Sequence, residues 1–441
     1  MKPSVLFLAL ALFATASHAQ DPVDQSTNVH IPEVWTARQA VTFALAENPD
    51  STIALKKIEE ARAVVDIARS ADFPQLNLAA EYGQTNNPMY AFGSLLNQGA
   101  YNEGIDFNEP GTTDNLQLKA GVSYRLYDGG ENRAAKMAAE ADVEMAKADQ
   151  LAVHQQLGFE VLRAFYTIIQ TEQLVQVREE SLDAITASLQ VGLARFEAGD
   201  LLRQDLLNLE LQQSVASENL IRSRHHLQLA RRGFANLLGL PASEVAVAAG
   251  DTQEVPDTLD YRNRHELLQL KSQEAFAMAE IERARSGQLP SLDTFADYQV
   301  NQGWITEESG DSWMAGIRLQ YSLFDGGNTA SRITLATLRL QKIQALRKKT
   351  ELALNLDLEQ AQLDYQQARE RLAVTEKMVE VAQEAARLSR ARFRQGVILA
   401  SDLIDFELRL SDAQARQLAA DTGVRTAVAN LRRATGLSQF P

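Results

Sequence analysis

Tyr124-Arg-Leu-Tyr-Asp-Gly-Gly130 is the stretch that decides the fold, because it recurs as Tyr321-Ser-Leu-Phe-Asp-Gly-Gly327. The first stretch begins at residue 124 and the second at residue 321, an offset of 197 residues. A second motif repeats at the same offset, since Arg195-Phe-Glu-Ala-Gly199 corresponds to Arg392-Phe-Arg-Gln-Gly396. Separate motifs that share one offset indicate two copies of one structural unit, so the sequence predicts an internal duplication.

Upstream of each Asp-Gly-Gly, apolar and polar residues alternate, which is typical of strands with two different faces. A helix-patterned stretch precedes the strands in each copy, at 37–71 and 262–286. Pro74 and Pro290 end these helices, because the residue before proline disfavours the α region. A long loop, 84–115, separates the first pair of strands. The predicted strands lie at about 75–83, 115–127, 291–300 and 313–324.

Downstream of each Asp-Gly-Gly the pattern turns helical and contains no proline as far as residues 196 and 393. Each of these stretches would form a helix about 100 Å long. Gly199 and Gly396 follow, and apolar residues at heptad-like spacing then predict a second helix. Each copy is therefore expected to end in an antiparallel helical hairpin, at 131–240 with its tip near 199 and at 328–437 with its tip near 396.

The N-terminus has the pattern of a secretory signal peptide. Lys2 precedes an apolar run at 5–14, and Ser17-His18-Ala19 forms a small-residue cleavage site. The run is too short to span a membrane as a helix. The expected organisation is a signal peptide (1–19), a first structural repeat (20–241), a linker (242–257) and a second structural repeat (258–441).

Composition excludes several classes of function. The chain has no cysteine, which rules out thiol catalysis and zinc-thiolate sites. Its net charge of −15 argues against a nucleic-acid partner, because such proteins need a clustered basic face. The sequence lacks a nucleophile elbow and a P-loop, and His265-Glu266 does not continue into the HExxH zinc pattern. We therefore expect no enzyme activity, no cofactor and no metal site.

The predicted strands have the length needed to cross a bilayer. Phe73, Tyr127 and Phe324 flank them, at positions where a membrane interface favours aromatic residues. Four strands cannot close a barrel, and open edges are not tolerated in lipid. Several copies must then complete the ring, and three copies, with 12 strands, form the smallest assembly expected to leave a pore. The alternative is a soluble β-layer that caps a coiled coil.

These features resemble the TolC-like outer membrane efflux protein family, also called outer membrane factors. The resemblance covers essentially the whole chain after the signal peptide, and its most specific elements are the duplication, the Asp-Gly-Gly junctions and the Arg-Phe-x-x-Gly motifs at the tips. It implies a mainly α fold with membrane β, in which long antiparallel α-helical hairpins form a coiled-coil tunnel in the periplasm. Four transmembrane β-strands per protomer would contribute to a 12-stranded trimeric barrel in the outer membrane.

The function implied by this resemblance is that of a passive exit duct in a tripartite efflux or type I secretion system. A homotrimer would conduct substrates to the exterior, docked on a periplasmic adaptor (membrane fusion) protein and an inner-membrane pump of the RND, ABC or MFS type. The main alternative is a soluble periplasmic coiled-coil adaptor or scaffold. Adaptors usually carry one hairpin, whereas this sequence predicts two. A secreted hydrolase is a more distant alternative.

Three sets of residues are candidates for the mechanism. The strand-to-helix junctions come first, at Asp128, Gly129, Gly130, Asp325, Gly326 and Gly327. The hairpin tips are expected to contact the adaptor, with the leucine, valine and isoleucine side chains exposed: Gly199, Leu201, Leu202, Gly396, Val397 and Ile398. The third set is an acidic ring at the periplasmic entrance, formed by Asp402 and Asp405 with Asp205 from the first copy. Alternatively, these acids only favour the helix dipole.

One position departs from the family pattern. Some relatives have a basic residue two positions after the second tip glycine, where it ties the closed entrance to the position of Asp205. This sequence has Ile398 there. Either Arg203 or Arg394 replaces that base, or apolar packing holds the entrance.

Overall fold

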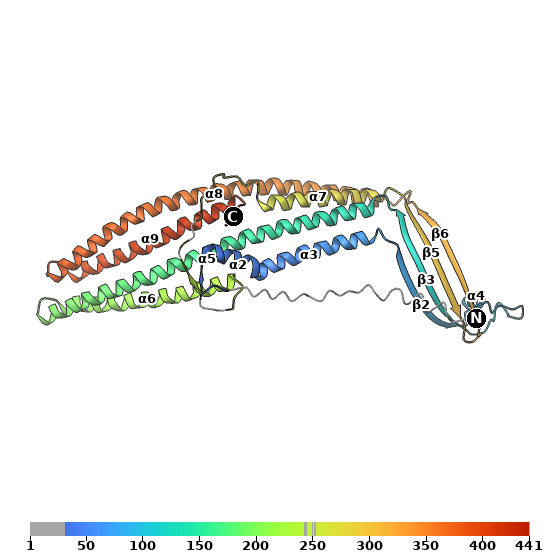
Figure 1. The fold of residues 1–441 in the computed structure, drawn as a ribbon, viewed down its shortest axis with the longest axis horizontal. Helices are drawn as coiled ribbons and strands as arrows, with labels where there is room; N and C mark the ends of the chain where they lie inside the picture. The colour runs from blue at the N-terminus through green and yellow to red at the C-terminus, as the bar shows by residue number, and fades with distance from the viewer. Residues whose placement is uncertain (1–30, 242–244, 249, 251–252, 441) are drawn as a thin grey trace.

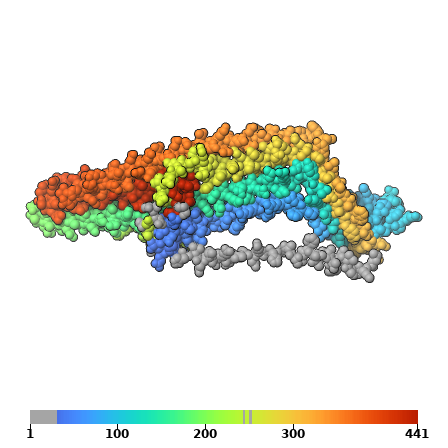
Figure 2. Space-filling view, turned by 45° about the horizontal axis from the view of Figure 1, so that its top comes forward, coloured from blue at the N-terminus to red at the C-terminus, as the bar shows by residue number. Residues whose placement is uncertain are grey.

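The protein is a long helical body with a β-sheet at one end (Figure 1). The computed structural model describes residues 31–241, 245–248, 250 and 253–440. The expected signal peptide at 1–19 lies outside the described residues. In Figure 1 the sheet lies at the right, and two pairs of helices end close together at the left. The space-filling view in Figure 2 shows the same elongated outline, with the ends of the two pairs in contact.

Two helical hairpins run toward the end opposite the sheet. In the first, α5 (Glu131–Glu197) is followed by α6 (Arg203–Leu237), and in the second, α8 (Asn328–Arg394) is followed by α9 (Ala400–Ala434). Helices α5 and α8 each have 67 residues, and α6 and α9 each have 35. The long helices therefore extend about 100 Å at 1.5 Å per residue.

Two shorter helices complete the layer next to the sheet. Helix α3 (Pro49–Ser70) packs against α5, and α7 (His265–Ser286) lies between α5 and α8. Farther from the sheet, α6 packs on α5, and α9 packs on both α8 and α5. Each long helix therefore spans two tiers: α5 contacts α3 and α7 in one tier and α6 and α9 in the other, whereas α8 contacts α7 in the first tier and α9 in the second.

The main hydrophobic core lies where the two tiers meet. Trp35 of strand β1 (Val34–Trp35) is 1% exposed, and its ring packs edge-on against Phe43 of helix α2 (Ala37–Glu47). Strand β1 pairs in parallel with β4 (Ala246–Val247), which lies inside the expected linker. The segment 242–257 is therefore more than a connection, because it supplies a strand that packs beside this core.

The sheet contains four antiparallel strands in the order β2-β3-β5-β6, and its two faces differ in polarity. One face carries the paired row Leu78, Ala120, Tyr298 and Trp313. On the other face, Lys119 lies 3.2 Å from Asp297. Within the described residues, β2 and β6 each have one edge that pairs with no strand. The strand bounds are β2 Gln75–Thr85, β3 Thr113–Tyr127, β5 Ser291–Gln302 and β6 Ser309–Gln320.

The last strand was predicted at 313–324 but spans Ser309–Gln320, so the prediction was wrong at both ends. Strand β6 ends at Gln320, not at 324, because Gln320 pairs with Ser291, the first residue of β5. Residues beyond Gln320 have no strand opposite them. Phe324 lies outside the sheet and is 88% exposed.

The single helix expected at 37–71 is also wrong, because it consists of α2 and α3 with a break at Asn48. Pro49 has no N–H to continue α2. The side chain of Asn48 accepts a hydrogen bond from the backbone N–H of Asp50 at 2.7 Å and so caps α3.

The loop expected at 84–115 contains a helix, α4 (Pro88–Asn97). The buried Gln98 follows it and donates to the carbonyl of Asp114 at 2.6 Å. Gln98 also accepts a hydrogen bond from Thr306 at 2.7 Å. These bonds fix α4 to the end of the sheet that lies away from the helical body (Figure 1). None of the described helices is both long enough and apolar enough to cross a membrane.

Candidate functional site: the junctions and the hairpin tips

The first strand-to-helix junction is a capped turn with two glycines. The carboxylate of Asp128 accepts hydrogen bonds from the N–H groups of Gly130 and Asn132, both at 2.8 Å. Gly129 and Gly130 have positive φ angles of 66° and 92°, which L side chains rarely adopt. The aspartate therefore satisfies the free donors at the start of α5, and the glycines permit the sharp change of direction.

The second junction repeats this geometry. The carboxylate of Asp325 accepts from the N–H of Gly327 at 3.0 Å and from both the N–H and the hydroxyl of Thr329, at 2.8 and 2.6 Å. These hydrogen bonds, led by that of the Thr329 hydroxyl, lower the pKa of Asp325. Gly326 and Gly327 again have positive φ angles, of 69° and 86°. The same device thus begins both long helices.

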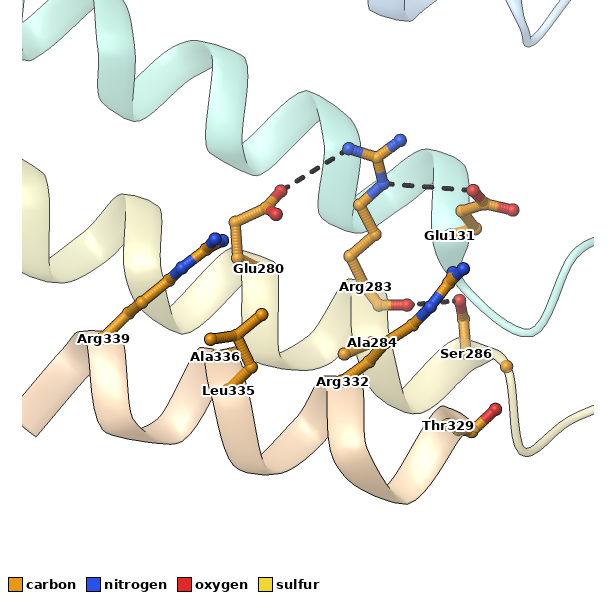
Figure 3. Close-up of a pocket in the computed structure, with 11 residues that line it drawn as sticks. Glu131, Glu280, Arg283, Ala284, Ser286, Thr329, Arg332, Leu335, Ala336 and Arg339 are labelled. Carbon is orange, nitrogen blue, oxygen red and sulfur yellow. Dashed lines mark hydrogen bonds and ion pairs between the residues drawn. The ribbon is translucent and has the colours of Figure 1, made fainter. Parts of the chain in front are cut away.

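A pocket of about 320 Å³ lies next to these junctions, between α7 and the start of α8 (Figure 3). Arg283 of α7 lies 3.9 Å from Glu131 of α5 and 3.5 Å from Glu280 of its own helix. Arg332 and Arg339 of α8 line the same pocket. The sequence patterns did not indicate this cluster, which joins α7 electrostatically to the first turn of α5.

The two hairpin tips have the same backbone turn. Gly199 and Gly396 have φ angles of 84° and 76°. The N–H of Asp200 donates to the carbonyl of Arg195 at 2.8 Å, and the N–H of Val397 donates to the equivalent carbonyl at 3.0 Å. A glycine in this conformation just past a helix end is the usual way to close the last turn.

Apolar residues at the tips divide into a buried and an exposed group. The expectation that Leu201 and Ile398 are exposed is wrong, because both pack against a cluster built on Leu209, Phe393, Ala400 and Leu403. This cluster lies between the two hairpins and buries whichever tip side chain points toward it. Three apolar tip residues remain largely exposed: Leu202 (70%), Val397 (67%) and Leu399 (62%).

Leu399 was missed from the sequence, although a signal for it existed. It lies 197 residues after Leu202, and each of the two leucines is the N-cap residue of the helix that follows its tip. Applying the repeat offset to Leu202 would have identified it.

Arg195 is a second functional candidate that sequence reasoning missed. Its guanidinium donates to the carbonyl of Phe393, in the other hairpin, at 3.0 Å and to the carbonyl of Asp200 at 3.2 Å. It also lies over the Phe393 ring, 5.1 Å from the centroid. The repeated Arg-Phe-x-x-Gly motif identified Arg195 as part of the turn, but it did not predict the contact of Arg195 with the other hairpin.

The three candidate acids are all near the tips but differ in their partners. Asp402 is exposed and Asp205 is half-buried, and neither forms an ion pair with another described residue. Asp405 lies 2.8 Å from Arg409, which is one turn farther along α9. The structure therefore leaves Asp402 and Asp205 uncompensated. Within the described ranges no cluster of acidic and histidine side chains could hold a metal ion.

The two bases considered as replacements at the entrance have other partners. Arg203 lies over the ring of Phe196 at 5.8 Å, and the Nε of Arg394 donates to the carbonyl of Arg390 at 3.3 Å. Ile398 packs into the apolar cluster between the hairpins. Within one chain the tips are thus held by apolar packing and by Arg195.

A bidentate ion pair also ties the second hairpin together near its tip. Arg390 of α8 donates through Nη2 to the carboxylate of Glu407 of α9 at 2.6 Å, and the glutamate side chain is 3% exposed. Hydrogen bonding to Glu407 raises the pKa of Arg390. Arg390 therefore compensates the negative charge of the buried Glu407.

Comparison with known proteins finds relatives over nearly the whole described chain. CyaE of Bordetella pertussis is 25% identical over 344 residues, which cover 75% of this chain and 69% of CyaE. TolC of Vibrio cholerae is 24% identical over 68% of this chain and 67% of its own. The solved structure of the outer membrane protein VceC from Vibrio cholerae superposes with a TM-score of 0.75 at 18% identity, covering 91% of this chain and 96% of VceC.

The family model described as outer membrane efflux protein matches residues 41–240 and 261–437. The two matched segments include both hairpins, both junctions and all four strands of the sheet. Together with the mostly helical fold and its antiparallel sheet, this match confirms the resemblance seen in the sequence: the chain belongs to the outer membrane efflux protein family.

Proposed function

We propose that three copies of this chain assemble into a passive duct, with the sheets forming a 12-stranded barrel in the outer membrane and the hairpins a tunnel in the periplasm. As a member of its family the chain is an outer membrane exit duct of an efflux or secretion system. A periplasmic adaptor and an inner-membrane pump of the RND, ABC or MFS type would supply substrate and energy. Transport through the duct itself requires no catalysis.

The observation that carries this proposal is the two-faced sheet with open edges. Its apolar face is exposed, with Leu78 at 72%, Trp313 at 76% and Ile317 at 69%. An exposed apolar face of this size favours contact with lipid. Its opposite face carries ion pairs and amides, such as Arg125 with Asp293 at 2.9 Å and Gln117 with Gln299 at 3.1 Å. Such a face suits a water-filled lumen.

Closure by other copies follows from the edges. Strands of 11 to 15 residues are long enough to cross the hydrocarbon layer. Unpaired edges of β2 and β6 would each leave backbone groups without partners in lipid. Pairing β6 of one copy with β2 of the next removes both edges. The exposed Phe73 and Tyr127 then lie at the interface near the periplasm.

The equal lengths of the two hairpins support an internal duplication, with repeats at 20–241 and 258–441 joined through 242–257. Three copies would then present six similar hairpins around the tunnel. The adaptor would dock on the exposed apolar residues of the tips, Leu202, Val397 and Leu399. Asp402 and Asp205 would supply the main charge of the acidic ring, with a smaller contribution from Asp405, because Arg409 compensates it.

The native mass of protein extracted in mild detergent from purified outer membranes tests the assembly. A trimer in this fraction is the expected result. A monomer recovered from the soluble periplasm would contradict it and would favour the soluble adaptor or scaffold.

Docking at the tips is tested by replacing Leu202 and Leu399 together with aspartate. We expect export to be lost while the amount of trimer stays unchanged, because a charge on each tip opposes apolar contact. Leu151→Asp is the matched control, since Leu151 is an exposed leucine of α5 far from the tips. Export that survives the double replacement would remove the tips as the docking surface.

A further inference from the structure

Arg195 makes a contact between the two hairpins whose repeat counterpart does not form within one chain. Its guanidinium donates to the carbonyl of Phe393 at 3.0 Å and lies 5.1 Å from the centre of that ring. A guanidinium within about 6 Å of a ring centre is attracted by the negative face of the ring. Phe393 is 1% exposed as a result of this contact and of the cluster between the hairpins.

By the repeat offset of 197 residues, Arg392 is the equivalent of Arg195, and Phe196 is the equivalent of Phe393. Arg392 is exposed, and its guanidinium has no partner in the part of the chain that the structure describes. Phe196 is only half-buried. The carbonyls of Phe196 and Phe393 each accept one hydrogen bond at 3.0 Å from the tip glycine of their own hairpin. The acceptor at Phe196 therefore has the same geometry and a free lone pair.

Within one chain, Arg392 cannot reach Phe196 in the way that Arg195 reaches Phe393. Arg195 and Phe393 are in contact because α5 packs against α9, which belongs to the same hairpin as Phe393. Among the described residues, helix α8 has no such neighbour on the corresponding side. Arg203 lies over the Phe196 ring at 5.8 Å, but its own counterpart is Ala400, so this contact is not part of the repeated arrangement.

The uncovered side of α8 continues well beyond the tip. On α5, Gln155 donates to the carbonyl of Leu437 at 3.4 Å, and Tyr166 lies under Arg425 of α9. Their counterparts on α8 are Leu352 and Leu363, which are 74% and 65% exposed. On α5 this face is covered by α9 and the residues after it. The equivalent face of α8 is apolar and exposed to solvent. Helix α6 is the counterpart of α9, so α6 of a second copy is the occupant that fits this face.

We propose that Arg392 contacts Phe196 of a second copy of this chain, donating to its carbonyl and lying over its ring. The inference rests on the trimer proposed above and assigns one contact of its subunit boundary. Three Arg195 contacts within chains would alternate with three Arg392 contacts between chains. Together they form a closed ring of six arginines at the periplasmic entrance.

Chemical cross-linking tests the contact directly, because the chain has no cysteine of its own. The double variant Phe196→Cys, Arg392→Cys is treated in outer membranes with a short bismaleimide and then denatured. We expect covalent dimers and trimers on the gel. The control variant Arg195→Cys, Phe393→Cys should cross-link within one chain and run as a monomer. Either cysteine of the test pair alone should give no ladder.

The native mass of the same untreated variant separates the two proposals. A trimer without interchain cross-links would overturn the Arg392 contact and leave the trimeric duct intact. A linked monomer in the test pair would mean that Arg392 reaches Phe196 of its own chain, which also overturns the contact. A monomeric native mass would overturn the duct and, with it, the contact.

A second pair of variants is independent of cysteine replacement. Arg392→Ala removes three of the six contacts at the entrance, so the conductance of the purified trimer in a planar bilayer should rise roughly twofold or more. Arg394→Ala, two residues away and exposed, should leave the conductance unchanged. Equal conductance in the two variants would contradict the proposed role of Arg392.

Discussion

Gly129 and Gly326 occupy equivalent turns with nearly equal φ angles, yet their surroundings differ. A Cβ atom on Gly129 would lie 2.8 Å from both the Cβ of Leu289 and the carbonyl oxygen of Ser286. A Cβ atom on Gly326 would have no described heavy atom within 4 Å. Gly129 is therefore required both by its positive φ and by the close approach of Leu289 and Ser286, whereas Gly326 is required by its positive φ alone.

Gly129→Ala should destabilise the helical body more than Gly326→Ala. Positive φ costs each alanine about 1 kcal/mol, and crowding at Gly129 adds roughly 1–3 kcal/mol. Thermal unfolding of the purified protein, followed by circular dichroism, measures the difference. Equal unfolding temperatures for the two variants would show that the close approach at Gly129 relaxes without cost.

Asp402 and Asp405 differ in charge compensation, so their asparagine variants should differ in function. In planar bilayers, Asp402→Asn should raise the concentration of trivalent cation that half-blocks the channel by roughly tenfold, because the proposed trimer would lose three uncompensated charges at its entrance. Asp405→Asn should have a smaller effect, since Arg409 already lies 2.8 Å from that carboxylate. Block that is unchanged in both variants would remove the acidic ring.

At the residue scale the sequence predicted the turns but not the direction of every side chain. The junction and tip glycines follow from their motifs, because positive φ is a local requirement. Leu201 and Ile398 were predicted exposed and are packed inward. Their partial burial depends on a cluster that both hairpins build, from residues some 200 positions apart in the sequence, and no local pattern encodes that cluster.

Helices α7, α8 and α9 are joined by one group of charges. Arg264, at the start of α7, is 5% exposed and donates to Asp357 of α8 at 2.9 Å. Arg433 of α9 donates to the same carboxylate at 2.8 Å. Although partial burial opposes it, hydrogen bonding from the two arginines holds the pKa of Asp357 below its usual value of 3.8.

This group should make the helical body sensitive to acid. A carboxylate whose pKa is lowered by folding contributes stability above its unfolded pKa of 3.8 and loses that contribution as the pH falls through the folded pKa. Unfolding temperature should therefore decrease between about pH 5 and pH 3. Asp357→Asn should cost about 1–2 kcal/mol at neutral pH, because it leaves the buried Arg264 with one fewer partner, and should flatten the acid response.

The matched control is Asp364→Asn, on the same helix. Asp364 is exposed and forms no ion pair with another described residue. Its variant should follow the wild-type unfolding curve at every pH. An acid response of Asp357→Asn as steep as that of the wild type would exclude Asp357 as its source.

At the element scale the hairpins and the two-faced strands were accessible from the sequence because their periodicity is long and regular. The break between α2 and α3 was also encoded, by Pro49 and its capping Asn48, but the helical pattern continues on both sides of it. Helix α4 has only 10 residues, and the side that it buries is defined by its contact with the end of the sheet. The end of β6 depends on where β5 begins, which is a property of the pairing and not of β6.

The assembled molecule should depend on leucines that a single chain leaves uncovered. Leu352, Leu356 and Leu363 are 74%, 64% and 65% exposed, while their counterparts on α5 contact residues of α9 or the segment just after it. Replacing all three with glutamine should lower the temperature at which the trimer dissociates, because burial of each leucine contributes about 1–2 kcal/mol per subunit. Native gel electrophoresis after graded heating measures this temperature.

The control replaces Leu151 of α5 with glutamine. Its counterpart on α8 is Lys348, so neither hairpin uses this position for apolar packing. The trimer should dissociate at the wild-type temperature. Equal dissociation of the triple variant and the wild type would mean that the subunits meet through another face.

The equal lengths of α5 and α8 have a consequence for the whole machine. Both helices begin at the same kind of glycine cap and end at the same kind of glycine turn, 67 residues later. All tips of the proposed trimer would then end in one plane parallel to the membrane. The distance from the outer membrane to that plane is set by residue count alone, so an insertion in one hairpin would tilt the plane, whereas matched insertions in both would only move it deeper. Evolution can therefore adjust the reach of the duct to the width of the periplasm without changing the surface that the next component meets.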